Sequence, residues 1–423
     1  MLKKRVPSPE IPRKEDVYAP GLPPAELPRP PLPLMGNQEE SMTASSPQPN
    51  EKIRVLCVAG ARPNFMKIAP LMHEFVRRAD RFEPILVHTG QHYDQAMSDS
   101  FFKDLGIPEP DVNLGVGSGT HGHQTAQVLM KIEDLLIERE PHVVLVVGDV
   151  NSTIAATLAA IKLHIPVAHV ESGLRSWDRE MPEEVNRVLT DSVSHWLFTT
   201  EPSAEENLLR EGIPREKIHF VGNVMIDTLL THKARAQELD TLDRLGLEPG
   251  KYAVLTLHRP SNVDHAEQLA KLFEVLGRLN QEIPVVFPIH PRTAKAVADN
   301  MGGVTPDLHL TDPLGYLDFL RLLTDAQMVL TDSGGIQEET TALGVPCLTL
   351  RESTERPVTI TEGTNEIVGT NPNDIDAAIQ RLRSGPPREG KRPALWDGKA
   401  AVRIVDILER DVLATRKNEP GSA

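Results

Sequence analysis

Short apolar segments alternate with helix-length segments twice along this chain, and this alternation restricts the possible fold more than any other feature. The apolar segments, such as VVLVVGD and MVLTD, are continuous runs and do not alternate between apolar and polar residues. Continuous apolar runs are typical of strands that are buried on both faces of a parallel sheet. The pattern therefore predicts two α/β domains, each built on a doubly wound parallel sheet of the Rossmann-like type.

The expected elements follow from these runs and from the stretches between them. In the first half we expect strands at residues 53–60, 83–90, 143–149, 165–171, 195–200 and 218–222, with helices near 65–79, 94–105, 120–139, 151–163, 182–194 and 203–211. In the second half we expect strands at 252–258, 283–290, 308–312, 328–332 and 345–350, with helices near 264–281, 293–301, 314–324, 335–343 and 373–385. A polar stretch near 223–250 that lacks a strand marks the switch between the two halves.

These patterns predict three regions. Residues 1–50 hold 12 of the 36 prolines, and proline at this density disfavours helix and sheet, so we expect a disordered tail. The tail is either a ligand for a proline-binding groove or an extension without a partner. Residues 51–225 form a first domain, which is joined by a C-terminal helix at about 397–413, and residues 226–396 form the second domain.

Composition and charge exclude several classes of protein. The chain carries 45 basic and 60 acidic residues, a formal net charge of −15, so nucleic acid and anionic membranes are poor partners. Its two cysteines, Cys57 and Cys347, cannot form a disulfide framework or a structural zinc site. The sequence has no apolar run of about 18 residues and no apolar segment behind its basic start. We therefore expect neither a membrane span nor a secretory signal, and a cytoplasmic location.

The segment TDSGGIQEE, Thr331 to Glu339, is the clearest candidate for a binding motif. An apolar strand ends at Thr331, two glycines turn the chain, and a helix begins near Gly335. Glycines permit close approach of the backbone, and the first N–H groups of a helix attract phosphate. We therefore expect Ser333, Gly334 and Gly335 to bind phosphate. The alternative is an ordinary turn between strand and helix with an N-cap residue.

Basic residues also gather at the expected ends of strands. Arg62 and Lys67 follow the first strand, and further histidines and arginines follow later strands, namely His92, His258, His290, Arg351 and Arg356. Guanidinium groups suit phosphate and carboxylate, so this set predicts an anion-binding site. Isolated surface side chains are the alternative. A metal site is not expected, because the chain has neither HExxH nor a cysteine cluster.

Residues 117–122 match the dinucleotide-binding pattern GxGxxG, but their context does not fit. A dinucleotide site requires a strong strand directly before the glycines and an acidic residue about 20 residues later. Here the preceding segment is weakly apolar, and the next acid at the end of a strand is Asp149. We therefore expect a loop at this place.

Acidic residues end two of the apolar strands, where packing alone does not require them. Asp149 ends VVLVVGD, Glu171 ends IPVAHVE, and Glu183 begins the helix PEEVNRVL. Three carboxyl groups at one sheet edge can divide acid and base roles if their surroundings separate their pKa values. The whole pattern predicts a cleft between the domains for a polyanion with a nucleotide end, with cations on one wall and carboxylates on the other.

The motifs that carry these residues resemble, in the same order, those of the non-hydrolysing UDP-N-acetylglucosamine 2-epimerases. They are GARPNFMKIAPL, TGQHYD, VVGDVNST, HVESGLRS, MPEEVNR, LHRPSNVD, PIHPRT, LTDSGGIQEE and RESTERP, and the resemblance covers about residues 52–412. It implies a GT-B-like fold that binds a UDP-sugar between two Rossmann-like domains, usually as a homodimer. It also implies reversible conversion of UDP-GlcNAc to UDP-ManNAc without a cofactor, for polysaccharide biosynthesis.

The resemblance further implies a mechanism and a set of roles. Anti elimination of UDP gives 2-acetamidoglucal, and syn re-addition then places the C2 proton on the other face of the ring. Asp149, Glu171 and Glu183 correspond to the acidic catalytic group, without an assignment of base and acid among them. The other correspondences are diphosphate stabilisation by His258 and Arg62, phosphate binding by Ser333, Gly334 and Gly335, ribose binding by Glu339, uracil contact by Phe319, and ligand contacts by Arg351 and Arg356.

The chain departs from the family pattern in two places. Several bacterial members carry HRRE where this chain has His258 followed by Arg-Pro-Ser, so ligand contacts beyond the histidine stay open. Some members bind a second UDP-GlcNAc as an activator through an arginine, and this chain has Gln127 at that position. Gln91 and His92 remain as candidate regulatory residues.

Other functions would share much of this pattern. A hydrolysing relative would release free ManNAc and UDP, and another relative would epimerise a UDP-diacetamido-uronic acid. A GT-B glycosyltransferase would need an acceptor. A UDP-sugar sensor without catalysis would have no reason to keep three acidic residues.

Overall fold

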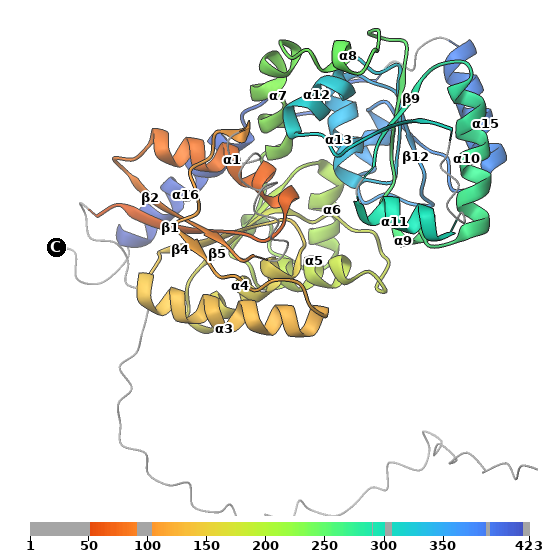
Figure 1. Cartoon of the computed structure of the whole chain (residues 1–423). Coiled ribbons are helices and arrows are strands. Elements are labelled where there is room, and N and C mark those ends of the chain that lie inside the picture. Colours follow the sequence, from red (N-terminus) through yellow and green to blue (C-terminus); the bar gives the residue numbers. More distant parts are fainter. Residues whose placement is uncertain (1–50, 91–103, 290, 301–306, 386–389, 418–423) are drawn as a thin grey trace, which may run out of the picture. The chain divides into compact units, whose positions relative to one another are not determined.

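The computed structural model describes residues 51–90, 104–289, 291–300, 307–385 and 390–417. Within this part of the chain two parallel sheets are present, of seven and six strands, with helices packed against them (Figure 1). The predicted fold class, two α/β units with parallel sheets, is therefore confirmed. The expected tail at residues 1–50, Gln91, His92 and His290 lie outside the described residues.

Every strand pair in both sheets is parallel within the described residues. The first sheet has the order β3-β2-β1-β4-β5-β6-β7, with β1 (Ile53–Ala59), β2 (Phe82–His88), β3 (Val112–Asn113), β4 (Val143–Val147), β5 (Val167–Ser172), β6 (Trp196–Thr199) and β7 (Ile218–Phe220). The second has the order β10-β9-β8-β11-β12-β13, with β8 (Ala253–Thr256), β9 (Val285–Pro288), β10 (His309–Thr311), β11 (Met328–Thr331), β12 (Cys347–Thr349) and β13 (Asn365–Ile367).

The helices connect these strands. Those of the first half are α1 (Arg62–Arg77), α3 (His121–Arg139), α4 (Asn151–Lys162), α5 (Pro182–Val193) and α6 (Pro202–Arg210). They are followed by α7 (Val224–Gln237), α8 (Thr241–Arg244), α9 (Pro260–Val263), α10 (Ala266–Asn280), α11 (Pro291–Asn300), α12 (Tyr316–Thr324), α13 (Gly334–Leu343), α14 (Val358–Thr361), α15 (Pro372–Ser384) and α16 (Ala400–Lys417). None of these described helices has the length and apolar character that crossing a bilayer requires.

The continuous apolar runs are explained by helices on both faces of each sheet. Helices α1 and α16 lie on one face of the first sheet, and α3 and α4 lie on the other (Figure 1). In β1, Val55 and Cys57 pack with residues of α1 and α16, whereas Leu56 and Val58 pack with residues of α3 and α4. Successive strand residues point to opposite faces, so a strand covered on both sides needs apolar residues throughout. Burying one such side chain contributes about 1.5–3 kcal/mol. Residues of α16 pack in the same cluster as those of α1 and the first sheet, and the domain boundaries, with the C-terminal helix assigned to the first domain, stay a prediction.

Strand order fixes where ligand-binding residues lie. In the first sheet, β1 is followed by β2 on one side and β4 is followed by β5 on the other side. In the second sheet, β8 is followed by β9 and β11 by β12 in the same way. Ligands of such sheets bind beyond the carboxyl ends of these central strands. Asp149 follows β4, His258 follows β8, and Ser333 follows β11, so these three predicted site residues follow central strands.

Helix α7 is the main difference from the expected elements, because it occupies much of the stretch interpreted as a polar switch. Its apolar residues, including Val224, Met225 and Ile226, are concentrated in the first turns and are buried. The polar second half of the helix lowers the average hydrophobicity of the segment, so the buried face gives no clear periodic signal. β3 and β13 are likewise not predicted, because two or three residues give no periodic signal. The GxGxxG segment lies in a loop up to Thr120, and its last glycine is in the first turn of α3.

Candidate functional site

Glu171 has the most unusual backbone among the predicted site residues. It lies at the end of β5 with φ of +70°, at a shift in register between β5 and β6. Such a bulge re-aims a side chain, and a left-handed backbone is costly for a residue other than glycine. The redirected carboxylate forms ion pairs with Lys67 of α1 and with Arg356, at 2.8 Å from the latter. Burial opposes ionisation, but these two cations outweigh it and hold the pKa of Glu171 below its usual range.

Arg356 connects this carboxylate to the predicted phosphate-binding motif. A Cβ atom added to Gly334 would lie 2.6 Å from Nη1 of Arg356, so the missing side chain leaves the space that the guanidinium occupies. The Nε atom lies 3.0 Å from Glu338. The structure therefore brings Glu171 and Lys67 of the first α/β unit together with Gly334 and Arg356 of the second.

Two carboxyl groups behind this contact have pKa values that burial raises above the usual range. Burial raises the pKa of Glu338 to about 7, against the opposing charge of Arg356. Burial, with the nearby Glu338, raises the pKa of Glu339 to about 8. Glu338 also accepts a hydrogen bond of 2.9 Å from Asn223. The predicted ribose ligand Glu339 is thus buried one residue beyond the contact with Arg356.

Asp149 is held by Arg187, a residue of α5. The guanidinium binds Asp149 through Nη1 and Glu184 through Nη2, the latter at 2.7 Å. Glu184 in turn accepts hydrogen bonds from the backbone of Ser176 and Trp177, at 2.9 and 3.0 Å. The three residues thereby join the turn after β4 to the loop before α5.

Glu183 begins the same helix and is half-buried. Its negative charge acts on Arg259 of the second unit, alongside Glu355 and Asp332. Burial, followed by the neighbouring Arg351, lowers the pKa of Arg259. Glu183 therefore faces the group of charges that follows the second sheet.

A single carboxylate, Glu355, organises that group. It binds Arg351 at 2.8 and 3.0 Å, and it lies 3.5 Å from Arg356 and 3.7 Å from Arg259. Burial opposes its ionisation, but hydrogen bonds from Arg351 and the charge of Arg356 lower the pKa of Glu355 to about 2. Three guanidinium groups are thus fixed around one anion.

His258 follows β8, and its side chain is 57% exposed. Its Nδ1 lies 2.6 Å from Asp332, which also accepts hydrogen bonds from the backbone of His258 and Arg259. Burial opposes ionisation of Asp332, but the contacts with His258 keep the pKa of that carboxyl low. The imidazole is therefore oriented on one side by a buried anion while its body is accessible to a ligand.

The other predicted residues lie around this set. Ser333 is the N-cap of α13, and Phe319 of α12 packs in one cluster with Ile336 of the first turn of α13. Arg62 begins α1, and its side chain lies outside the described residues, as do His290, Gln91 and His92. Among the described residues, no group of three or more His, Cys, Asp or Glu side chains is placed to hold a metal ion.

Several site residues are not predicted from the sequence, namely Arg187, Glu184, Glu338, Asp332 and Glu355. All five are charged and buried, and a buried charge requires a partner. Their burial could not be recognised without coordinates, because charged residues near strand ends are usually exposed. The available signal was the density of charge in RESTERP and in MPEEVNR.

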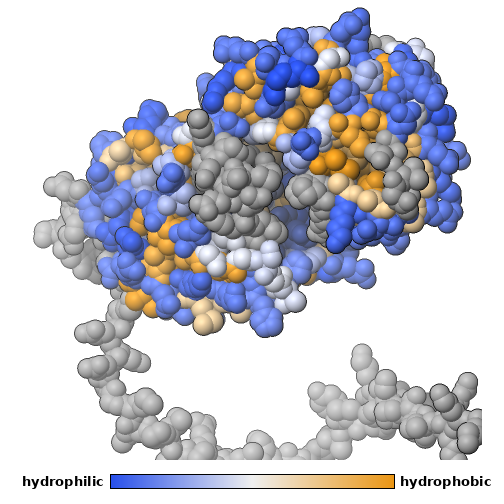
Figure 2. Space-filling view, viewed as in Figure 1, coloured by the Kyte–Doolittle hydropathy of each residue, from blue (hydrophilic) through white to orange (hydrophobic). Residues whose placement is uncertain are grey.

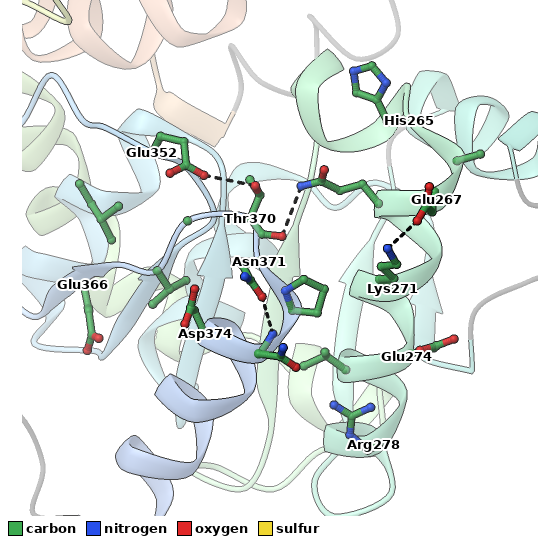
Figure 3. Close-up of a pocket in the computed structure, with 18 of the residues that line it drawn as sticks. His265, Glu267, Lys271, Glu274, Arg278, Glu352, Glu366, Thr370, Asn371 and Asp374 are labelled. Carbon is green, nitrogen blue, oxygen red and sulfur yellow. Dashed lines mark hydrogen bonds and ion pairs between the residues drawn. The ribbon is translucent and has the colours of Figure 1, made fainter.

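A separate pocket of about 1560 Å³ lies in the second unit, between α10 and the start of α15. Its lining side chains are mainly polar, and Lys271 points toward Glu267 while Glu352 points toward Thr370 (Figure 3). It contains none of the residues that the sequence singles out. The ion-paired residues around Arg356, rather than this pocket, are therefore the candidate site.

The low pKa of Glu355 leads to a stability prediction. Glu355→Gln should lower the free energy of unfolding at neutral pH by about 3 kcal/mol, because three arginines lose a buried anion. A carboxylate with a lowered pKa stabilises the fold above its unfolded pKa. The difference from the parent should therefore shrink as the pH falls from about 4.5 toward about 2. Urea denaturation at several pH values measures it.

Glu352→Gln is the matched control, because this exposed glutamate lies on the same loop. It should change the free energy of unfolding by less than about 0.5 kcal/mol. Equal effects of the two substitutions at neutral pH would contradict the role of Glu355.

Comparison with known proteins identifies the family. Residues 74–409 match the family model described as UDP-N-acetylglucosamine 2-epimerase. A UDP-N-acetylglucosamine 2-epimerase of Methanococcus maripaludis is 41% identical over 83% of this chain and 97% of its own length. A UDP-2,3-diacetamido-2,3-dideoxy-D-glucuronate 2-epimerase of Pseudomonas aeruginosa is 41% identical over 85% of this chain and 100% of its own.

A solved structure gives the same result. The UDP-GlcNAc 2-epimerase of Methanocaldococcus jannaschii, crystallised with UDP-GlcNAc and UDP, superposes with a TM-score of 0.78 at 40% identity. The alignment covers 85% of this chain and 100% of that one. The chain therefore belongs to the UDP-N-acetylglucosamine 2-epimerase family, as its motifs predicted.

Proposed function

We propose that this chain catalyses the reversible epimerisation of UDP-N-acetylglucosamine at C2, without hydrolysis, to UDP-N-acetylmannosamine. The observation that carries the proposal is the contact of Glu171 with Arg356, which lies over Gly334. A carboxylate suited to proton transfer is thereby next to a cation and a helix N-terminus suited to diphosphate. The relative crystallised with UDP-GlcNAc and UDP supports this ligand class.

The proposed reaction has two stages. In the first, one of the carboxylates Asp149, Glu171 and Glu183 takes the C2 proton, the electron pair of the C2–H bond forms the C1–C2 double bond, and the C1–O bond breaks. UDP leaves with the electron pair of the C1–O bond, and 2-acetamidoglucal remains. In the second, a β-phosphate oxygen bonds to C1 again and a carboxyl group returns a proton to the opposite face of C2. Atoms and electrons balance without an oxidant.

Departure of UDP is the demanding step, because the C2 proton is only weakly acidic until positive charge develops at C1. Groups oriented toward the developing phosphate anion therefore matter as much as the base. Arg356, His258 and the first N–H groups of α13 are the proposed donors. One oriented donor is typically worth about 3–4 kcal/mol, and a positioned base gives about 10²–10⁴-fold. Glu171, held ionised by its cation partners, begins in the form that accepts a proton.

A second candidate is epimerisation of a UDP-diacetamido-uronic acid. The Pseudomonas aeruginosa relative named for that activity is as similar to this chain as the Methanococcus maripaludis relative named for UDP-GlcNAc. A uronic acid adds a carboxylate to the sugar, and Arg259, whose ion pair with Glu355 is long at 3.7 Å, is the kind of group that would bind it.

Incubation with UDP-GlcNAc in D₂O tests the proposal. We expect UDP-ManNAc to appear and deuterium to enter C2 of both epimers, because the removed proton exchanges with solvent before its return. NMR spectroscopy measures both. Accumulation of free ManNAc and UDP would show a hydrolysing enzyme, and turnover of the UDP-diacetamido-uronic acid alone would show the second candidate. A glycosyltransferase would leave the sugar unchanged without an acceptor.

Variants of the three carboxylates test their proposed roles. Asp149→Asn, Glu171→Gln and Glu183→Gln should each lower turnover by at least about 100-fold, since each removes a group that transfers or orients a proton. UDP should still bind, as measured by calorimetry. Glu180→Gln, an exposed neighbour of Glu183, is the control and should retain turnover. Near-parental turnover in one of the three variants would remove that residue from the catalytic group.

We also propose that the chain is a homodimer. Met130 and Ile137 are 65% and 45% exposed on α3, seven residues apart and thus on one face of the helix. The surface in view is mainly hydrophilic, with separate hydrophobic patches (Figure 2), and such patches often mark contacts between subunits.

Light scattering should give twice the chain mass, and the double substitution Met130→Glu with Ile137→Glu should halve the measured mass. Val76→Glu, an exposed apolar control on α1, should leave it unchanged, and a monomeric parent would contradict the proposal.

A further inference from the structure

A histidine inside the first sheet contacts the backbone that carries the proposed carboxylates. His169 of β5 is fully buried, with no exposed surface. Its Nδ1 lies 2.7 Å from Oδ1 of Asp191 and its Nε2 lies 2.8 Å from the carbonyl oxygen of Gly148. A backbone carbonyl only accepts hydrogen bonds, and an ionised carboxylate does the same. Both ring nitrogens are therefore donors in this arrangement.

The contact at Nε2 fixes the turn that presents Asp149. Gly148 is the residue directly before it and has φ of +66°. A Cβ atom at Gly148 would lie 2.9 Å from Nζ of Lys67, the cation that binds Glu171. Position 148 therefore requires glycine, and the hydrogen bond from His169 holds the orientation of the Gly148 peptide group.

The contact at Nδ1 reaches the other two carboxylates. Oδ2 of Asp191 accepts a hydrogen bond of 3.0 Å from the backbone of Gly173, two residues after Glu171. Asp191 itself belongs to α5, the helix that begins with Glu183 and carries Arg187, the partner of Asp149. One imidazole thus joins the turn after β4, the end of β5 and helix α5.

The charges around the ring are balanced. Asp191 also pairs with Arg175 at 2.7 Å, and Arg175 pairs with Glu211 at 2.7 Å. Burial opposes ionisation of Asp191, but His169 and Arg175 outweigh it and keep the pKa of that carboxyl low. Ordinary packing does not require such a set, because replacing buried ion pairs by apolar residues is often neutral for stability.

We propose that His169 is a positioning residue for epimerisation: by donating to Asp191 and to Gly148, it holds Asp149, Glu171 and Glu183 in one geometry. The proposal rests on the proposed function. The ring touches neither substrate nor reacting atoms, so its effect should appear in the chemical step and not in ligand binding. A displacement of about 1 Å at a reacting group can cost about 10²-fold in rate.

His169→Gln tests the proposal, because glutamine cannot donate at both positions. We expect kcat for UDP-GlcNAc to fall by about 10- to 100-fold with unchanged KM and unchanged affinity for UDP. His142→Gln is the matched control: His142 is also buried, but it accepts a hydrogen bond from Arg54 at the amino end of β4. It should lower stability without lowering kcat. Equal kcat values for His169→Gln and the parent would overturn the proposal, as would equal losses in both variants.

A double-mutant cycle separates positioning from loss of packing. If His169 and Asp191 act as one unit, His169→Gln with Asp191→Asn should lower kcat no further than the more severe single variant. Multiplied losses would show independent effects and would contradict the proposed unit. Thermal unfolding of all three variants gives the folded fraction by which each kcat is corrected.

NMR spectroscopy of the parent enzyme provides a test that does not depend on the turnover of the variants. With ¹⁵N-labelled histidine, the ring of His169 should show hydrogen on both nitrogens, and its signals are identified by their change in Asp191→Asn. Hydrogen on one nitrogen alone would overturn the proposed double donation. The parent is assayed first: absence of epimerisation would refute the proposed function, whereas turnover by the parent with unchanged kcat in His169→Gln would refute only the role of His169.

Discussion

The site depends on one buried cation, the guanidinium of Arg356, whose side chain is 9% exposed. A guanidinium removed from water is costly unless carboxylates surround it. Glu171, Glu338 and Glu355 supply this environment, and together they raise the pKa of Arg356 further. Glu171 lies at the end of a strand of the first sheet, whereas Glu338 and Glu355 belong to the second unit. The ion pairs that compensate the buried charge of Arg356 therefore connect strand ends of both sheets.

The charges of the site are interleaved, although the sequence suggested cations on one wall and carboxylates on the other. Lys67 and Arg187 lie on the side of the first sheet, and Asp332 and Glu355 lie on the side of the second. The reason is desolvation: in a buried site each ion must be neutralised within a few ångströms, so that a wall of one sign cannot be buried. Separate roles for cations and carboxylates therefore do not require separate places.

The sequence was sufficient for the longer strands of both sheets and for acidic residues at strand ends. Continuous apolar runs predict strands such as β1 and β4, and an acid at the end of such a run, as with Asp149 and Glu171, has no packing explanation. The bulge at Glu171, the burial of Glu355 and both contacts of His169 depend on register and on distant segments. Helix α7 was missed because its buried face occupies only its first turns. The sequence could not show which acidic residue pairs with which arginine, since any of several arginines could pair with any of several acids.

The pairing of acids with arginines also determines how an acidic protein of net charge −15 could hold the proposed anionic ligand. The sequence pointed to a local excess of positive charge, but in the structure the cations nearest the phosphate-binding turn already have carboxylate partners. We therefore expect long-range attraction to be weak and the proposed diphosphate to depend on short-range donors, namely the α13 N-terminus, Arg356, and the partly exposed His258 and Arg259. The ion-paired cations also hold the carboxylates in place, and the same ion pairs that make burial of the site possible orient the groups proposed for proton transfer.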